Sequence, residues 1–190
     1  NVSIKRYPCC HAIHTFIDGV FDIKEKHHIE WQKIKHITCR VNPLGAKLVC
    51  EPIEVKRMPK TIYGARFSLP YTIAISLLDG ELGLKQFSEQ KIKNECVLEI
   101  TSKIYCVKDE SFPRTGGNIV IEMNDGKKYQ YIKEFPIGSP QFPLKEQQVI
   151  DKFKANVKDI IEYNKADNII KKVMNIEDVT QIKELMELLQ

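Results

Sequence analysis

The segment that most constrains the fold is 118–135, in which two runs of alternating apolar and polar residues flank an Asn-Asp-Gly sequence at 124–126. Alternation with a period of two is typical of β-strands, because successive side chains point to opposite faces of a sheet. An Asp-Gly pair between two such runs favours a tight turn. We therefore predict an antiparallel hairpin that pairs 118–123 with 127–135, and a loop over 109–117 that leads into it.

Three further segments carry strand-like patterns. Residues 34–41 and 96–108 alternate and contain β-branched side chains, which favour strands. Residues 48–58 are an interrupted strand candidate, because Pro52 and Pro59 cannot donate backbone hydrogen bonds to a neighbouring strand. These segments predict a mainly antiparallel sheet built around the hairpin.

Helical patterns occupy the rest of the chain. Apolar residues recur at helical spacing over 9–26, directly after Pro8, which suits the first turn of a helix. Residues 67–78 are apolar on all sides and predict a buried helix with Pro70 in its first turn. Shorter or later helices are expected at 83–93, 145–163, 166–174 and 176–189. Together the patterns predict an α+β fold in which the sheet packs against helices and the C-terminal tail is helical.

Charge and apolar content narrow the classes of partner. The 29 basic and 25 acidic residues are spread along the chain, with no basic block and no aromatics interleaved with arginine. This pattern does not suggest nucleic-acid binding. The longest apolar stretch, at 73–78, is far too short to span a bilayer. We therefore expect neither a nucleic acid nor a membrane as a partner.

The chain has six cysteines without the close, regular spacing of a disulfide framework, and no secretory signal precedes them. We expect reduced thiols in a cytoplasmic protein. The sequence begins at Asn1 without an initiating methionine and reaches a chemistry-rich run within ten residues, so we also expect it to be a fragment of a longer protein. The cysteines are Cys9, Cys10, Cys39, Cys50, Cys96 and Cys106.

That N-terminal run concentrates reactive side chains. Lys5 and Arg6 lie just before a helix start, where backbone N–H groups already favour anions. His14 shares one helix face with Cys10, four residues earlier, and also neighbours His11, three residues earlier. The run could form a carboxylate-binding corner beside a titratable imidazole. The alternative is that both cations are solvated and His14 is a packed, hydrogen-bonded residue.

The same run invites a metal interpretation that the spacing does not favour. Zinc requires ligands that converge tetrahedrally, commonly as two pairs from separate elements. The adjacent Cys9 and Cys10 cannot both point inward from one helix, and no second pair follows nearby. We therefore expect no metal site. The Gly116-Gly117 pair also lacks the context of a phosphate-binding loop.

Four blocks of sequence resemble the MmgE/PrpD family. Residues 5–14, Lys-Arg-Tyr-Pro-Cys-Cys-His-Ala-Ile-His, followed by Ile17-Asp18, are similar to the signature that opens the second domain of these proteins. Residues 65–71, Ala-Arg-Phe-Ser-Leu-Pro-Tyr, with Leu-Leu-Asp-Gly at 77–80, resemble its second element. The turn at 124–127 and the segment 138–153 follow in the family's order, so that the resemblance covers nearly the whole chain.

The resemblance implies an architecture and an activity. Family members pair a large helical N-terminal domain with a smaller α+β domain that closes over the active site, and residues 1–190 would be that lid-like domain, without its helical partner. The family implies a lyase or isomerase that acts on a small polycarboxylate by water elimination, decarboxylation or epimerisation. It implies no metal and no organic cofactor, and commonly a homodimer. The fragment alone is expected to be inactive.

The resemblance also assigns roles to residues. Lys5 matches the family lysine that contacts a substrate carboxylate, and His14 matches the signature histidine, for which we predict a catalytic, orienting or proton-handling role. A histidine stands at the position of Cys10 in cis-aconitate decarboxylases, which favours a 2-methylcitrate dehydratase-like enzyme over a decarboxylase. A structural role remains open for the second element. The other predicted substrate-binding residues are Arg6, Arg66, Ser68 and Tyr71, with Cys10 and His11 as further candidates.

Two other classes of function remain open on these residues. One is a non-catalytic binding or regulatory module that retains the fold. The other is a thiol- or metal-dependent protein that uses Cys9 and Cys10.

Overall fold

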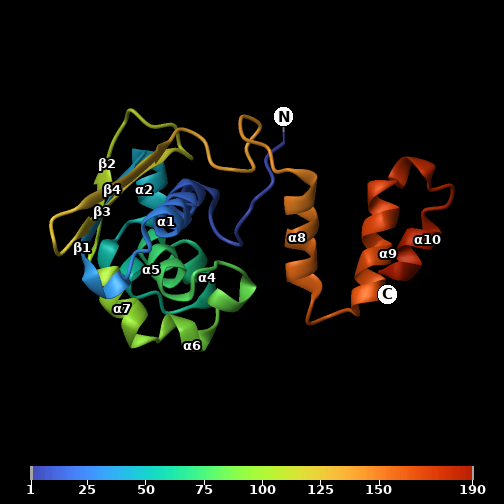
Figure 1. The fold of residues 1–190 in the computed structure, drawn as a ribbon, viewed down its shortest axis with the longest axis horizontal. Helices are drawn as coiled ribbons and strands as arrows, with labels where there is room; N and C mark the ends of the chain where they lie inside the picture. Colours follow the sequence, from blue (N-terminus) through green and yellow to red (C-terminus); the bar gives the residue numbers. More distant parts are fainter. Residues whose placement is uncertain (1, 190) are drawn as a thin grey trace. The chain divides into compact units, whose positions relative to one another are not determined.

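The computed structural model describes residues 2–189, and the chain divides into two compact units at Pro143 and Leu144. The first unit contains the sheet and its covering helices, and the second contains only helices (Figure 1). The domain predicted over 1–190 includes Asn1 and Gln190, which lie outside the described residues.

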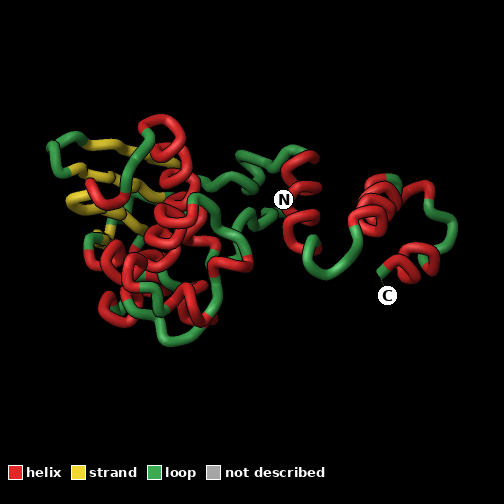
Figure 2. Tube along the Cα trace, turned by 60° about the horizontal axis from the view of Figure 1, so that its bottom comes forward, coloured by secondary structure: helices red, strands yellow, loops and turns green. Residues whose placement is uncertain are grey.

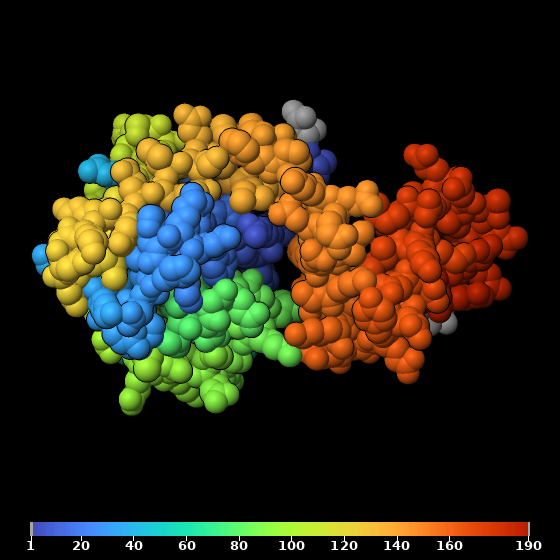
Figure 3. Space-filling view, in the orientation of Figure 1, coloured from blue at the N-terminus to red at the C-terminus, as the bar shows by residue number. Residues whose placement is uncertain are grey.

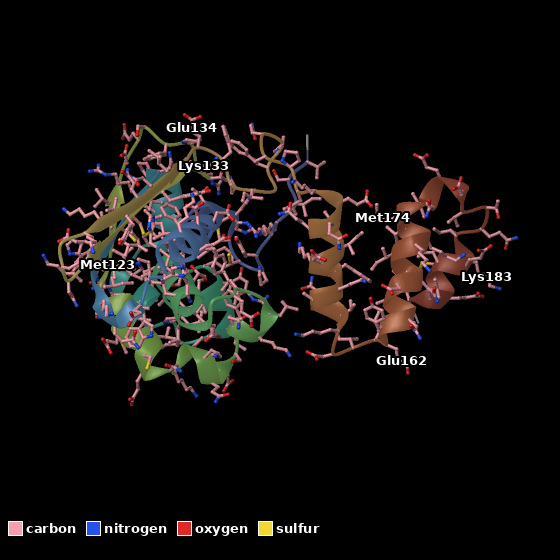
Figure 4. The ribbon with its side chains drawn as sticks, in the orientation of Figure 1. Met123, Lys133, Glu134, Glu162, Met174 and Lys183 are labelled. Atoms are coloured by element: carbon pink, nitrogen blue, oxygen red, sulfur yellow. The ribbon has the colours of Figure 1, made fainter. Side chains whose placement is uncertain are left out.

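The strands of the described chain form one four-stranded sheet in the order β2-β1-β3-β4. The pairs β1–β3 and β3–β4 are antiparallel, whereas β1–β2 is parallel. The predicted hairpin is confirmed as β3 and β4, whose turn places Gly126 at a φ of 85°, a conformation that glycine adopts without steric strain. Met123 at the end of β3 and Lys133 at the end of β4 lie at opposite ends of the hairpin (Figure 4). The strands are β1 Ile34–Val41, β2 Ile104–Lys108, β3 Gly117–Met123 and β4 Lys128–Lys133.

Two predicted strands are wrong over most of their length. Residues 48–58 form the end of one helix and a second short helix, and residues 95–102 form a helix that precedes β2. The side chain of Asn94 caps this helix by accepting from the N–H groups of Cys96 and Val97. The alternating pattern also contains Val97, Ile100 and Thr101, which are buried and have the spacing of one helix face. The same sequence is therefore compatible with a strand and with a helix.

The helices between β1 and β2 carry the chain back so that β2 runs parallel to β1, as a parallel pairing requires. The predicted buried helix is confirmed as α5, with Pro70 in its first turn and every residue from Leu69 to Leu77 buried. The helices of this crossover are α2 Pro43–Val49, α3 Ile53–Arg57, α4 Ile62–Arg66, α5 Leu69–Asp79, α6 Glu89–Ile92 and α7 Glu95–Ser102.

The core of the first unit lies between the sheet and two helices. Helix α1, His14–His27, follows a short 3-10 turn and packs on β3 and β4, while α5 packs against α1 and α7. Figure 2 shows helices packed beside the strands of this unit. A side chain at Gly19 of α1 would come within 2.6 Å of Ile119 and 2.9 Å of Tyr131, so glycine permits the close approach of α1 to the sheet.

The second unit confirms the predicted helical tail. It contains α8 Glu146–Val157, α9 Tyr163–Met174 and α10 Lys183–Leu188, so the single helix predicted over 145–163 ends earlier than expected. Ion pairs join α8 to α9 through Lys154 and Asp167, and α9 to α10 through Lys172 and Glu184. None of the helices in residues 2–189 has the length and apolar character needed to cross a membrane.

Candidate functional site

The N-terminal signature begins as an irregular segment that hydrogen-bonds to a distant loop and to the end of α4. The N–H of Ile4 donates to the carbonyl of Gly138 over 2.8 Å, and the N–H of Cys10 donates to the carbonyl of Arg66 over 2.9 Å. Figure 3 shows the N-terminal residues, in dark blue, beside the orange loop that precedes the second unit. The first and second predicted elements of the family therefore meet through the backbone.

A buried carboxylate on α1 fixes this segment. Asp18 Oδ1 accepts from Arg6 Nη1 at 3.2 Å and from the Tyr7 hydroxyl at 2.8 Å, while its Oδ2 accepts from the N–H of Ile137 at 3.0 Å. Burial raises the pKa of Asp18, and the hydrogen bonds from Ile137, Tyr7 and Arg6 oppose that rise. Burial and the Asp18 charge also raise the pKa of Tyr7, so the phenol keeps its proton and remains a donor. One carboxylate thus orders both the cationic segment and the loop at Ile137.

The two predicted cations lie at the accessible side of this arrangement. Lys5 is exposed, and the side chain of Arg6 is 37% exposed while that of Asp18 is 1% exposed. Arg6 lines an open pocket with Phe21 and Lys24, and its guanidinium carbon lies 5.4 Å from the centre of the Tyr7 ring. An arginine has five N–H donors, so the contact with Asp18 leaves Arg6 with donors to spare for an anion.

The imidazoles occupy two different depths. The ring of His14 is fully buried, 5.2 Å from the Tyr7 ring and 4.9 Å from the His11 ring between centroids. His11 is only partly buried, and its Nε2 has no hydrogen-bond partner within the described chain. Burial and the charge of Lys5 lower the pKa of His11, which favours the neutral ring. The catalytic role of His14 stays a prediction, because the rings that contact it are those of Tyr7 and His11.

Arg66 joins the candidate site from the second element. Its carbonyl holds Cys10, and its guanidinium carbon lies 5.7 Å from the centre of the Phe87 ring. The Nε of Arg66 is buried and has no hydrogen-bond partner among residues 2–189. A buried donor without an acceptor is unfavourable, and Arg66 as a whole is only partly buried.

Ser68 and Tyr71 lie apart from this cluster and are fully buried. The hydroxyl of Ser68 caps α5 by accepting from the N–H of Tyr71 at 3.0 Å, and it donates to the carbonyl of Lys56. The hydroxyl of Tyr71 donates to the carbonyl of Gln86. These contacts fit the structural role that the sequence left open, and substrate contact by either residue stays a prediction.

Three residues of this region had no predicted site role. Asp18 and Tyr7 belong to the quoted signature, and the signal for Asp18 was a carboxylate on an otherwise apolar helix face. Lys56 donates to the carbonyls of Leu48 at 2.7 Å and Phe67 at 2.8 Å, and burial lowers its pKa. Nothing in the sequence marks Lys56, because its partners are backbone groups brought together by folding.

The thiols of the signature differ in accessibility. Cys9 is buried, and Cys10 is partly exposed beside the carbonyl of Arg66. Burial raises the pKa of Cys9, with a further contribution from Cys10. Among the described residues, no group of three or more His, Cys, Asp and Glu side chains is arranged to hold a metal ion.

Comparisons with known proteins match this chain along its length. A family model described as the MmgE/PrpD C-terminal domain matches residues 7–178. A cis-aconitate decarboxylase of Aspergillus terreus is 24% identical over 201 residues, and one of Homo sapiens is 25% identical over 199 residues. Each alignment covers 100% of this chain, which spans 40% of the relative's length. A probable 2-methylcitrate dehydratase of Saccharomyces cerevisiae is 29% identical over 80 residues, covering 37% of this chain and 16% of that protein.

Proposed function

The chain belongs to the MmgE/PrpD family as its C-terminal domain, and from this membership we propose that it covers the pocket in which a larger enzyme binds a small polycarboxylate. The whole enzyme is then a lyase or isomerase that works without a metal or an organic cofactor. We assign it dehydratase chemistry of the kind named for the 2-methylcitrate dehydratase relative.

The observation that carries this proposal is the fixed cationic segment. The Asp18 carboxylate binds Arg6, Lys5 is exposed one residue earlier, and the backbone carbonyl of Arg66, itself only partly buried, accepts from Cys10 of the same segment. Guanidinium and ammonium groups recognise carboxylates through charge-assisted hydrogen bonds, which are roughly twice as strong as neutral ones. A polyanion is therefore the ligand class that this surface fits best.

Such a surface supports elimination chemistry. Removal of a proton from the carbon next to a carboxylate develops enediolate-like charge on that carboxylate, which adjacent cations stabilise in a water-poor cleft. The hydroxyl on the neighbouring carbon then leaves as water once it is protonated, and a carbon–carbon double bond remains. We assign proton handling on this wall to His11, a partly buried imidazole whose buried Nε2 has no hydrogen-bond partner among the described residues. The opposite wall belongs to the helical domain of the complete enzyme.

The resemblance favours dehydration over decarboxylation, because it implies a histidine at the position of Cys10 in decarboxylases. The relatives that align with the whole chain are nevertheless named as cis-aconitate decarboxylases. The protein at its natural length should therefore be assayed with both 2-methylcitrate and cis-aconitate, following alkene formation and carbon dioxide release separately. We expect alkene formation from the hydroxy acid. Carbon dioxide release from cis-aconitate without alkene formation from 2-methylcitrate would show that the enzyme is a decarboxylase.

The cationic segment is tested by Lys5→Ala and Arg6→Ala in the same protein. Each should lower kcat/KM roughly 10- to 100-fold, the effect of losing one hydrogen bond to a charged group. Lys127→Ala is the matched control, since Lys127 is an exposed lysine of the hairpin turn paired with Asp125. Equal activity of all three variants would remove the basis of the proposal.

The covering role is tested by expressing the 190-residue chain alone. We expect a folded protein with negligible turnover, because one wall of the pocket is missing. Robust dehydratase activity of the isolated chain would show that the site is complete within it.

One observation favours a second function, because the complete burial of His14 fits a binding or regulatory module that retains the fold without catalysing. In that case, Lys5→Ala and His14→Ala would leave turnover of the natural-length protein unchanged. The thiol- or metal-dependent alternative predicts stoichiometric zinc or iron in elemental analysis of the purified protein.

A further inference from the structure

Three cysteines far apart in the sequence meet at one corner of the sheet. Cys39 of β1 and Cys106 of β2 are direct partners in the parallel register. Cys50 directly follows α2, a helix that packs against β2, and it lines the same pocket as Cys106. The fold therefore assembles a thiol cluster that the spacing of the cysteines in the sequence does not suggest.

Access from solvent distinguishes the members of this cluster. Cys50 and Cys106 line the same open pocket, of about 440 Å³, together with Arg57 and Lys108. Cys106 is partly exposed, whereas Cys39 and Cys50 are buried. A small reagent that enters the pocket meets Cys106 first, with Cys50 behind it.

The protonation of the buried thiols adds to this difference. The hydrogen bond with Cys106, followed by burial, raises the pKa of Cys50, and burial raises that of Cys39. Both therefore remain protonated and react slowly with oxidants on their own, because the thiolate is the nucleophile. Cys50 nevertheless stays positioned to react with a modified Cys106.

We propose that Cys106 and Cys50 form a reversible oxidation site, at which a peroxide oxidises Cys106 and Cys50 then closes a disulfide with it. The Cys106 thiol loses its proton, its sulfur attacks one peroxide oxygen, the O–O bond breaks, and the departing hydroxide takes up a proton to form water. The Cys50 sulfur then attacks the sulfenic sulfur, the S–O bond breaks, and the hydroxide leaves with the Cys50 proton as a second water. Two thiols lose two protons and two electrons, which reduce one peroxide to two waters.

The site has a structural route to the cationic segment. Cys50 directly follows α2, and the carbonyl of Leu48 in the last turn of that helix accepts from Lys56 Nζ. The same Nζ donates to the carbonyl of Phe67, the neighbour of Arg66. A disulfide between Cys50 and Cys106 would pull on the C-terminal end of α2. That helix end and the second element both accept hydrogen bonds from Lys56.

The test is peptide mapping of the natural-length protein, reduced and then treated with hydrogen peroxide before its remaining thiols are alkylated. We expect a cross-linked peptide pair containing Cys50 and Cys106, lost again after treatment with dithiothreitol. A link from Cys106 to Cys39, stable oxidation of Cys106 without any link, or oxidation confined to the exposed Cys96 would each overturn the proposal.

Variants separate the two steps. In Cys50→Ser, Cys106 should stop at the sulfenic acid, which a dimedone probe traps, and the cross-link should be lost. Cys96→Ser is the matched control and should leave the link intact, because Cys96 is an exposed thiol on α7. Should Cys50→Ser fail to fold, Cys106→Ser provides the same loss of the link at a partly exposed position, and the map of the unmutated protein already decides between the outcomes.

Discussion

The two sequence elements that carry the family resemblance have different physical roles. In the first element, 5–18, the backbone is irregular up to Cys10, and a buried carboxylate binds the partly exposed Arg6. In the second, 65–80, the helix is buried on all sides, and the hydroxyls of Ser68 and Tyr71 are already bonded to backbone groups. The first element presents charge, and the second builds the scaffold behind it.

This difference shows what a recognisable sequence element does and does not indicate. Side chains such as Tyr71 and Lys5 stand in equally specific elements, yet one is completely buried and the other is exposed. Burial and existing hydrogen bonds decide whether a group is available to a ligand. We therefore expect substitutions in the second element to reduce stability, and those in the first to reduce substrate binding.

The largest expected effect is on stability at the second element. Tyr71→Ala removes a fully buried ring and its hydrogen bond to Gln86, and should lower the free energy of unfolding by about 3–5 kcal/mol. Tyr63→Ala is the matched control, because Tyr63 is 72% exposed, and it should change stability by less than ~0.5 kcal/mol. Urea unfolding followed by circular dichroism measures both. Similar losses for the two variants would contradict the scaffold role of α5.

An intermediate effect is expected at Asp18, which acts through Arg6. Asp18→Asn keeps the size of the side chain but weakens its hold on the guanidinium, so the cation samples more orientations. We expect KM to rise on the order of 10-fold with little change in kcat, since binding rather than chemistry loses an oriented partner. An unchanged KM would show that Asp18 only stabilises the fold. Asp22→Asn is the control, because Asp22 pairs with Lys26 on the exposed side of α1.

The sequence predicted those parts of the fold that local chemistry determines. The Asn-Asp-Gly turn fixes β3 and β4, and Pro70 with its apolar run fixes α5. It did not predict α7, because an alternating run with apolar residues at positions 97 and 100 satisfies both a strand and a helix, and the capping side chain of Asn94 decided the outcome. The parallel pairing of β1 with β2 also escaped prediction, since it depends on a crossover of several helices.

In the candidate site, too, the sequence predicted local properties but not those that depend on tertiary packing. Accessible charge at Lys5 and Arg6 follows from a polar run before a helix, which the sequence contains. The depth of His14, the bonds that occupy Ser68, and the donors that surround Asp18 are properties of tertiary packing. Sequence reasoning could therefore name the reactive groups but could not tell which of them the fold encloses.

The smallest expected effect is on the pH dependence of stability at two carboxylates that bind cations, Asp18 and Glu122. Burial raises the pKa of Asp18, so its stabilising contribution is fully present below the ordinary value of 3.8 and is lost as pH rises through the raised pKa. Hydrogen bonds from Lys35 and Lys128 lower the pKa of Glu122 to about 2, so its contribution is present above 4.5 and is lost as pH falls toward 2.

These opposite directions can be separated by measuring unfolding free energies over a pH series. The stability of the unmutated protein relative to Asp18→Asn should fall as pH rises through the raised pKa of Asp18. Its stability relative to Glu122→Gln should fall as pH drops below 4.5, because only the unmutated protein then loses its ion pairs with Lys35 and Lys128. If both differences moved in the same direction with pH, Asp18 would be titrating like the lysine-paired Glu122, and burial could not be what governs the carboxylate that binds Arg6.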